Sequence, residues 1–72
     1  MAPKVDHEKI AAALEGDPRS YDDIAREVAA LTYTNTSRQD LWRWSEGAGT
    51  PRANTLLALA HVLHRDVMEF TS

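Results

Sequence analysis

The stretch SRQDLWRWSEG, residues 37–47, decides how this 72-residue chain folds. Leu41 and Trp44 stand three positions apart, a spacing that puts both side chains on one face of a helix. Most of the remaining positions are polar or charged, and Gly47 is suited to end the helix. We therefore predict an amphipathic helix over about 37–46 that buries Leu41 and Trp44.

The start of this helix is ambiguous by one residue. Thr36 with Gln39, and Ser37 with Asp40, each have the spacing of a capping box, in which an N-cap side chain and a side chain three residues later satisfy free backbone N–H groups.

Helical periodicity and capping residues also occur on both sides of this stretch. Asp6 is suited to begin a helix that ends near Glu15, where Gly16 can take the left-handed conformation, and Ser20 to begin one that frays near Thr32. The expected inward positions are Ile10 and Leu14 in the first, and Ile24, Val28 and Leu31 in the second. Thr50-Pro51 should open a helix with the apolar stripe Leu56, Leu59, Ala60 and Leu63, and Asp66 should cap a short last helix that carries Val67 and Phe70.

Composition narrows the fold and the class of protein. Hydrophobic residues make up 43% of the chain, which is ordinary for a globular protein, and strand-like alternation is missing. We therefore expect one all-α domain over residues 1–72, a compact five-helix bundle. With no cysteine and no apolar run near the roughly 20 residues of a membrane span, the chain is expected to be soluble and cytoplasmic.

From residue 37 onward the sequence resembles the Cro and lambda-repressor-like (XRE) family of DNA-binding domains. The resemblance rests on Ser37-x-x-x-Leu41-x-x-Trp44-x-x-Gly47-x-x-x-Pro51, then Thr55-Leu56-Leu57-x-Leu59-Ala60-x-x-Leu63, Asp66 and Phe70, and upstream on Ser20-x-x-x-Ile24-Ala25. It implies a helix-turn-helix over about residues 20–46 whose second helix reads the major groove of double-stranded DNA. The implied function is a sequence-specific transcription regulator of repressor, Cro or antitoxin type, associated with the nucleoid, either complete or as part of a longer regulator.

The connection between these two helices departs from the family pattern. Asn35 stands where the family usually has the glycine of the turn, which makes the connection about six residues longer. Either the first helix of the motif gains a turn, or residues 30–35 form a surface loop.

The outward face of the predicted reading helix is expected to supply the base contacts. Arg38, Gln39 and Arg43 occupy the family's base-contacting positions; arginine can bond to guanine and glutamine to adenine in the major groove. The alternative is that the arginines are solvated, with Arg43 paired to Asp40.

Trp42 lies on the same outward face and has three interpretations. It covers the long connection by packing on Tyr33 or Leu31, it touches DNA, or it belongs to a protein interface.

Phosphate contacts are expected from helix N-termini and small polar side chains, several of which serve equally well as helix caps. The candidates are Ser20, Tyr21, Thr34, Asn35, Thr36, Ser37, Thr50, Arg52 and Asn54.

Enzymatic and metal chemistry find little support. His61 and His64 are spaced for a metal, but without cysteine and with only His7 as a further imidazole we expect no metal, no cofactor and no enzyme.

The net charge is the main argument against DNA binding. Eight Lys and Arg stand against eleven Asp and Glu, a net charge of −3, whereas DNA-binding domains usually carry a basic surface. Specific binding should then depend on base contacts and on a homodimer that reads two half-sites about one helical turn apart. The alternative is a protein–protein interaction module of the same fold with weak or no DNA binding.

Overall fold

A computed structural model describes residues 4–71 and has no strand in that range. Its elements are α1 (His7–Glu15), α2 (Tyr21–Thr32), α3 (Arg38–Glu46), α4 (Ala53–Val62) and the 3-10 helix η1 (Val67–Phe70). The predicted all-α class is confirmed. The predicted short fifth helix is a single 3-10 turn, so the described chain has four α-helices rather than five; after the turn the chain is extended at Thr71, where it pairs with Val5.

The predicted side-chain caps begin four of these elements. Asp6 accepts a hydrogen bond from the Glu8 backbone N–H at 3.0 Å, Ser20 from Asp23 at 3.1 Å, and Asp66 from Met68 at 2.9 Å. At α3 the second of the two capping boxes is used, because the Ser37 N–H donates to Asp40 Oδ2 at 2.9 Å.

The start of α4 differs from the prediction. Thr50 and Pro51 do not open the helix; Pro51 is buried in the connection, Arg52 after it is extended, and the helix begins at Ala53. The Pro51 ring is therefore part of the packed connection rather than the first helical position.

α1, α2 and α3 end at Glu15, Thr32 and Glu46, as predicted, but the backbone conformation after these ends follows the sequence less closely. Gly16 is right-handed, with φ −79°, so the predicted left-handed end of α1 is wrong. Gly47 does take φ 77°, and Tyr33 and His64 take the same left-handed region without being glycine. Thus α2 continues to Thr32, and only residues 33–35 of the suggested surface loop lie outside a helix.

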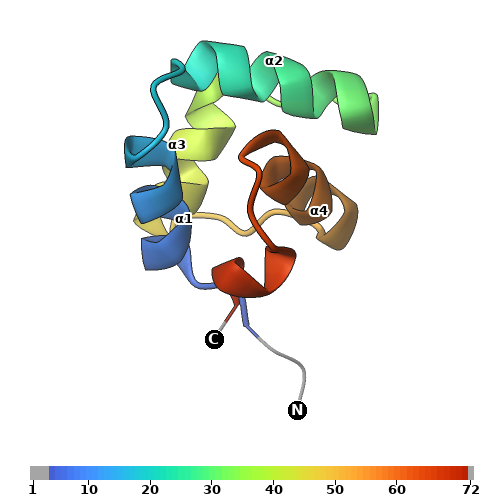
Figure 1. Cartoon of the computed structure of the whole chain (residues 1–72). Helices are drawn as coiled ribbons and strands as arrows, with labels where there is room; N and C mark the ends of the chain where they lie inside the picture. The colour runs from blue at the N-terminus through green and yellow to red at the C-terminus, as the bar shows by residue number, and fades with distance from the viewer. Residues whose placement is uncertain (1–3, 72) are drawn as a thin grey trace.

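α2 lies across the top of the molecule, over one end of α3, with α1 and α3 together on one side and α4 on the other (Figure 1). The described chain ends meet at the bottom beside η1, where the Asp6 N–H donates to the Phe70 carbonyl oxygen at 2.8 Å. The core between the helices is formed by the following fully buried side chains: Ile10, Leu14, Ile24, Val28, Leu41, Leu59 and Phe70.

Leu31 is the exception among the predicted inward residues. Its side chain is 51% exposed, because the end of α2 is only partly covered by the end of α4.

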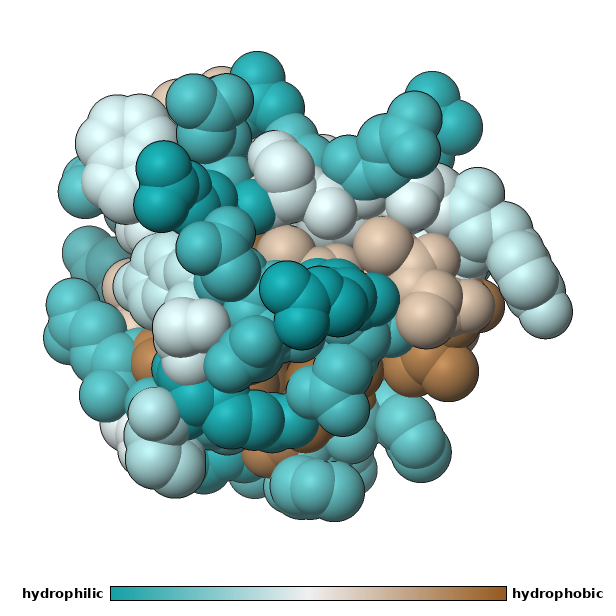
Figure 2. Space-filling model, turned by 90° about the horizontal axis from the view of Figure 1, so that it is seen from above, coloured by the Kyte–Doolittle hydropathy of each residue, from teal (hydrophilic) through white to brown (hydrophobic). Residues whose placement is uncertain are grey.

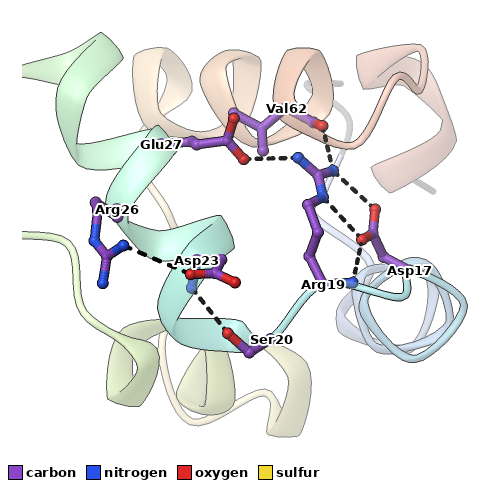
Figure 3. A network of polar contacts seen from close by, with 7 residues as sticks. All are labelled: Asp17, Arg19, Ser20, Asp23, Arg26, Glu27 and Val62. Atoms are coloured by element: carbon purple, nitrogen blue, oxygen red, sulfur yellow. Dashed lines mark hydrogen bonds and ion pairs between the residues drawn. The ribbon is translucent and has the colours of Figure 1, made fainter.

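Arg19 fixes α2 to its neighbours (Figure 3). Its guanidinium group bonds Asp17 through two nitrogens, at 2.9 and 2.8 Å, and Glu27 Oε2 at 2.7 Å. The same group donates to the Val62 carbonyl oxygen at the end of α4, at 2.6 Å. One side chain therefore joins the α1–α2 connection, α2 and α4, which sets where α2 lies above the core.

No helix within residues 4–71 is both long and apolar enough to cross a membrane.

Candidate nucleic-acid interface

α3 has one buried face and one exposed face. Leu41 is fully buried and Trp44 is 9% exposed, and both belong to the core, as predicted. The opposite face carries the four residues predicted to contact bases, all of them exposed: Arg38, Gln39, Trp42 and Arg43. Because the buried face is fixed against the core, these four side chains have a defined direction outward.

Both predicted base-reading arginines lie beside an aspartate. Arg43 Nη2 bonds Asp40 Oδ1, the pairing predicted from their spacing on the helix. Arg38 Nη1 lies 3.8 Å from Asp22 Oδ2 of α2, a contact between two elements that the sequence did not indicate. Hydrogen bonds from Ser37, and secondly from Arg43, hold the pKa of Asp40 below its ordinary value, so this carboxylate keeps its charge at neutral pH.

A groove of about 570 Å³ runs between α2 and the start of α3. Residues 34–39, all six of them predicted DNA contacts, form one wall. Asp22 and Arg26 of α2 help to form the other. Sequence reasoning missed these two residues, because nothing local to α2 shows that they face the connection.

Three threonine hydroxyls lie in a hydrogen-bonded row from the end of α2 into the α2–α3 connection. Thr34 Oγ1 lies 2.7 Å from both Thr32 Oγ1 and Thr36 Oγ1, and Thr32 in turn donates to the Val28 carbonyl oxygen at 2.9 Å. The hydroxyls of Thr34 and Thr36, predicted to bind phosphate, therefore already hold the connection against the end of α2.

Trp42 lines a second, smaller hollow with Tyr21, Arg38 and Gln39. The indole is 55% exposed. Tyr21 is half-buried against the core, and this burial raises the pKa of its hydroxyl. Tyr33 is 96% exposed, so the prediction that Trp42 packs on it is wrong, and Leu31 lines a different hollow beside α4.

The remaining predicted phosphate contacts are divided between two places. Ser20 caps α2, next to Tyr21 at the end of α2 that faces α3. Thr50, Arg52 and Asn54 are exposed around the start of α4, and they line neither the groove nor the Trp42 hollow.

The surface over α2 is mainly hydrophilic, with apolar atoms gathered toward one side (Figure 2). The half-exposed Leu31 belongs to the end of α2, where it lines a hollow with Ala30 and Val62.

His61 and His64 are both exposed and show no metal-binding arrangement. Residues 4–71 contain no group of three or more His, Asp or Glu side chains placed to hold a metal ion.

Comparisons of the chain with protein-family models, with curated proteins and with solved structures found no match.

Proposed function

We propose that this protein is a sequence-specific regulator of transcription that binds double-stranded DNA, with α2 and α3 acting as a helix-turn-helix. The observation that carries the proposal is the outward face of α3. A helix fixed by Leu41 and Trp44 presents two arginines, a glutamine and a tryptophan to solvent on one side. A helix of this kind fits the major groove, where each base pair has a distinct pattern of donors and acceptors.

Each outward residue has a role that its chemistry suits. Arg38 and Arg43 would donate to guanine O6 and N7, and Gln39 would pair with adenine N6 and N7. Trp42 would contact sugars or a thymine methyl group.

The groove between α2 and α3 would follow the DNA backbone. Its Thr34, Asn35 and Ser37 side chains are exposed, and the N-terminus of α2 at Ser20 and Tyr21 lies near α3. Polar side chains and free helix N–H groups bind phosphate oxygens and set the orientation of the protein on the duplex. Thr50, Arg52 and Asn54 would contact phosphates further along, from the start of α4.

A single domain of this size buries little DNA surface, so we propose that two copies bind together. A two-fold homodimer would place two α3 helices in successive major grooves and read two half-sites about one helical turn apart. We also propose that the protein acts in the cytoplasm, on the nucleoid.

Selection of bound sequences from a random duplex library tests this function directly. We expect an enriched motif, arranged as an inverted repeat if a dimer binds. Absence of any enriched motif, together with binding that disappears at physiological salt, would overturn the proposal.

Alanine substitutions test the assignment of α3. Arg38→Ala, Gln39→Ala and Arg43→Ala should each weaken binding to the selected duplex by about 1–3 kcal/mol, because each removes a base contact. Titration at fixed salt measures the loss. Arg65→Ala is the matched control, since Arg65 is also exposed and also paired, with Glu69 at 3.5 Å, but belongs to the α4–η1 connection. If binding survives all three changes in α3, the reading face has been assigned wrongly.

The second candidate function is a protein–protein interaction module. The exposed Trp42 favours it, because large aromatic side chains are frequent at the centres of protein interfaces. In that case Trp42→Ala would abolish partner binding while Arg38→Ala and Arg43→Ala leave it intact.

A further inference from the structure

The arginines on the α2–α3 face are matched by aspartates one to one. Arg26 lies 3.6 Å from Asp23, Arg38 lies 3.8 Å from Asp22, and Arg43 bonds Asp40. These six charges sum to zero. The α2–α3 part of the proposed DNA-binding surface therefore has no excess positive charge from its arginines.

The three pairs differ in what else the carboxylate does. Asp40 also accepts the Ser37 N–H and so begins α3. Asp23 and Arg26 are neighbours on one helix, where such spacing is common. Asp22 and Arg38 come from different helices and are 60% and 69% exposed, so their pair contributes little to folding.

We infer that Asp22 is a specificity-determining residue. Its carboxylate pairs with the Arg38 guanidinium group in the free protein and so opposes binding to DNA of arbitrary sequence. The inference rests on the proposed function. A backbone phosphate must displace Asp22 to reach Arg38, and Asp22 then repels that phosphate. In the complex with a cognate sequence Arg38 donates to guanine beside the base contacts of Gln39 and Arg43, so Asp22 repels no phosphate held by Arg38 there. Discrimination therefore comes from weakening the binding that every duplex offers.

Asp22→Asn tests this role. The variant should bind a random-sequence duplex about two- to fivefold more tightly at low salt, the range expected for one exposed ion pair. Its binding should also depend more steeply on salt, with the logarithmic slope increased by up to about 0.9. Affinity for the selected motif should rise less, so the ratio of specific to non-specific affinity should fall.

Glu8→Gln is the matched control. Glu8 is the second residue of α1, as Asp22 is of α2, so both changes remove one negative charge from the same position relative to a helix dipole. The preceding residue, His7, lies against Gly47, beyond the far end of α3 from Arg38. Thermal melts of both variants would check that each is folded.

A double variant identifies the group that Asp22 controls. If Asp22 acts through its ion pair with Arg38, the gain in non-specific affinity should disappear when Asp22→Asn is made in an Arg38→Ala background. The inference is overturned if Asp22→Asn has no effect, if Glu8→Gln gives an equal gain, or if the gain persists without Arg38. Failure of the proposed function is seen separately, because the unchanged protein would then enrich no motif from the library.

Discussion

Asp17 is a carboxylate whose charge is stabilised mainly by Arg19. The Arg19 side chain and backbone N–H donate hydrogen bonds to it, and these lower the pKa of Asp17 from 3.8 to about 2. A carboxylate with a lowered pKa in the folded state stabilises the fold above its ordinary pKa, and that contribution is lost as pH falls through the folded-state value. The affected window therefore runs from about pH 4 down to about pH 2.

We predict that Asp17→Asn lowers stability at neutral pH and reduces its pH dependence in that window. Urea denaturation at several pH values measures both effects. Asp40, whose pKa is also lowered, is unchanged in the variant. The difference between the curves of unfolding free energy against pH for the unchanged protein and the variant therefore isolates Asp17. Parallel curves between pH 4 and pH 2 would contradict the assignment.

Four of the five N-caps were predictable from the sequence, all but that of α4, whereas the backbone conformation that follows a helix end was predictable only at Gly47. Asp6, Ser20, Ser37 and Asp66 act as caps through bonds to residues two or three positions away, so a short stretch of sequence contains the whole interaction. An end depends instead on where the chain must go next. The C-terminus of α2 is left-handed at Tyr33, because the chain there turns toward α3.

Tyr33 therefore offers a test at the level of one helix. Its φ of 54° is unfavourable for a residue with a Cβ atom, and its 96% exposed side chain makes little compensating contact. We predict that Tyr33→Gly stabilises the fold by about 0.5–1 kcal/mol, measured by urea denaturation. Tyr33→Ala is the control, because it removes the ring but keeps the Cβ atom. Equal effects of the two changes would show that the backbone conformation is not the cause.

The outward face of α3 was predictable for the same local reason that made the caps predictable. Burial of Leu41 and Trp44 sets the direction of every other side chain on the helix, and Arg43 meets Asp40 within one turn. The pair of Asp22 and Arg38 depends on how α2 lies over α3, which no spacing along the chain specifies.

The arrangement of the whole molecule depends strongly on Arg19. Its guanidinium group meets Asp17, Glu27 and the Val62 carbonyl oxygen, which come from three separate parts of the chain. Arg19→Ala should lower the urea concentration at the midpoint of unfolding, because all of these contacts are lost together. Arg19→Lys should restore little of the loss, since one ammonium group cannot reproduce a planar set of bonds in three directions.

Arg26→Ala provides the comparison for Arg19. Arg26, whose own side chain is 78% exposed, forms an ion pair with Asp23 at 3.6 Å, and such exposed pairs contribute little to stability. A loss for Arg19→Ala no larger than that for Arg26→Ala would mean that the three contacts do not hold α2 in place.

The two tryptophans lie two residues apart on α3, one in the core and one at the surface. The fluorescence of an indole depends on its exposure to water, so the protein contains two optical reporters with different meanings. Trp42→Phe leaves the emission of Trp44, which follows unfolding of the core. Trp44→Phe leaves the emission of Trp42, which follows whatever approaches the exposed face. Folding and recognition can thus be monitored separately in the same short helix, without an added label.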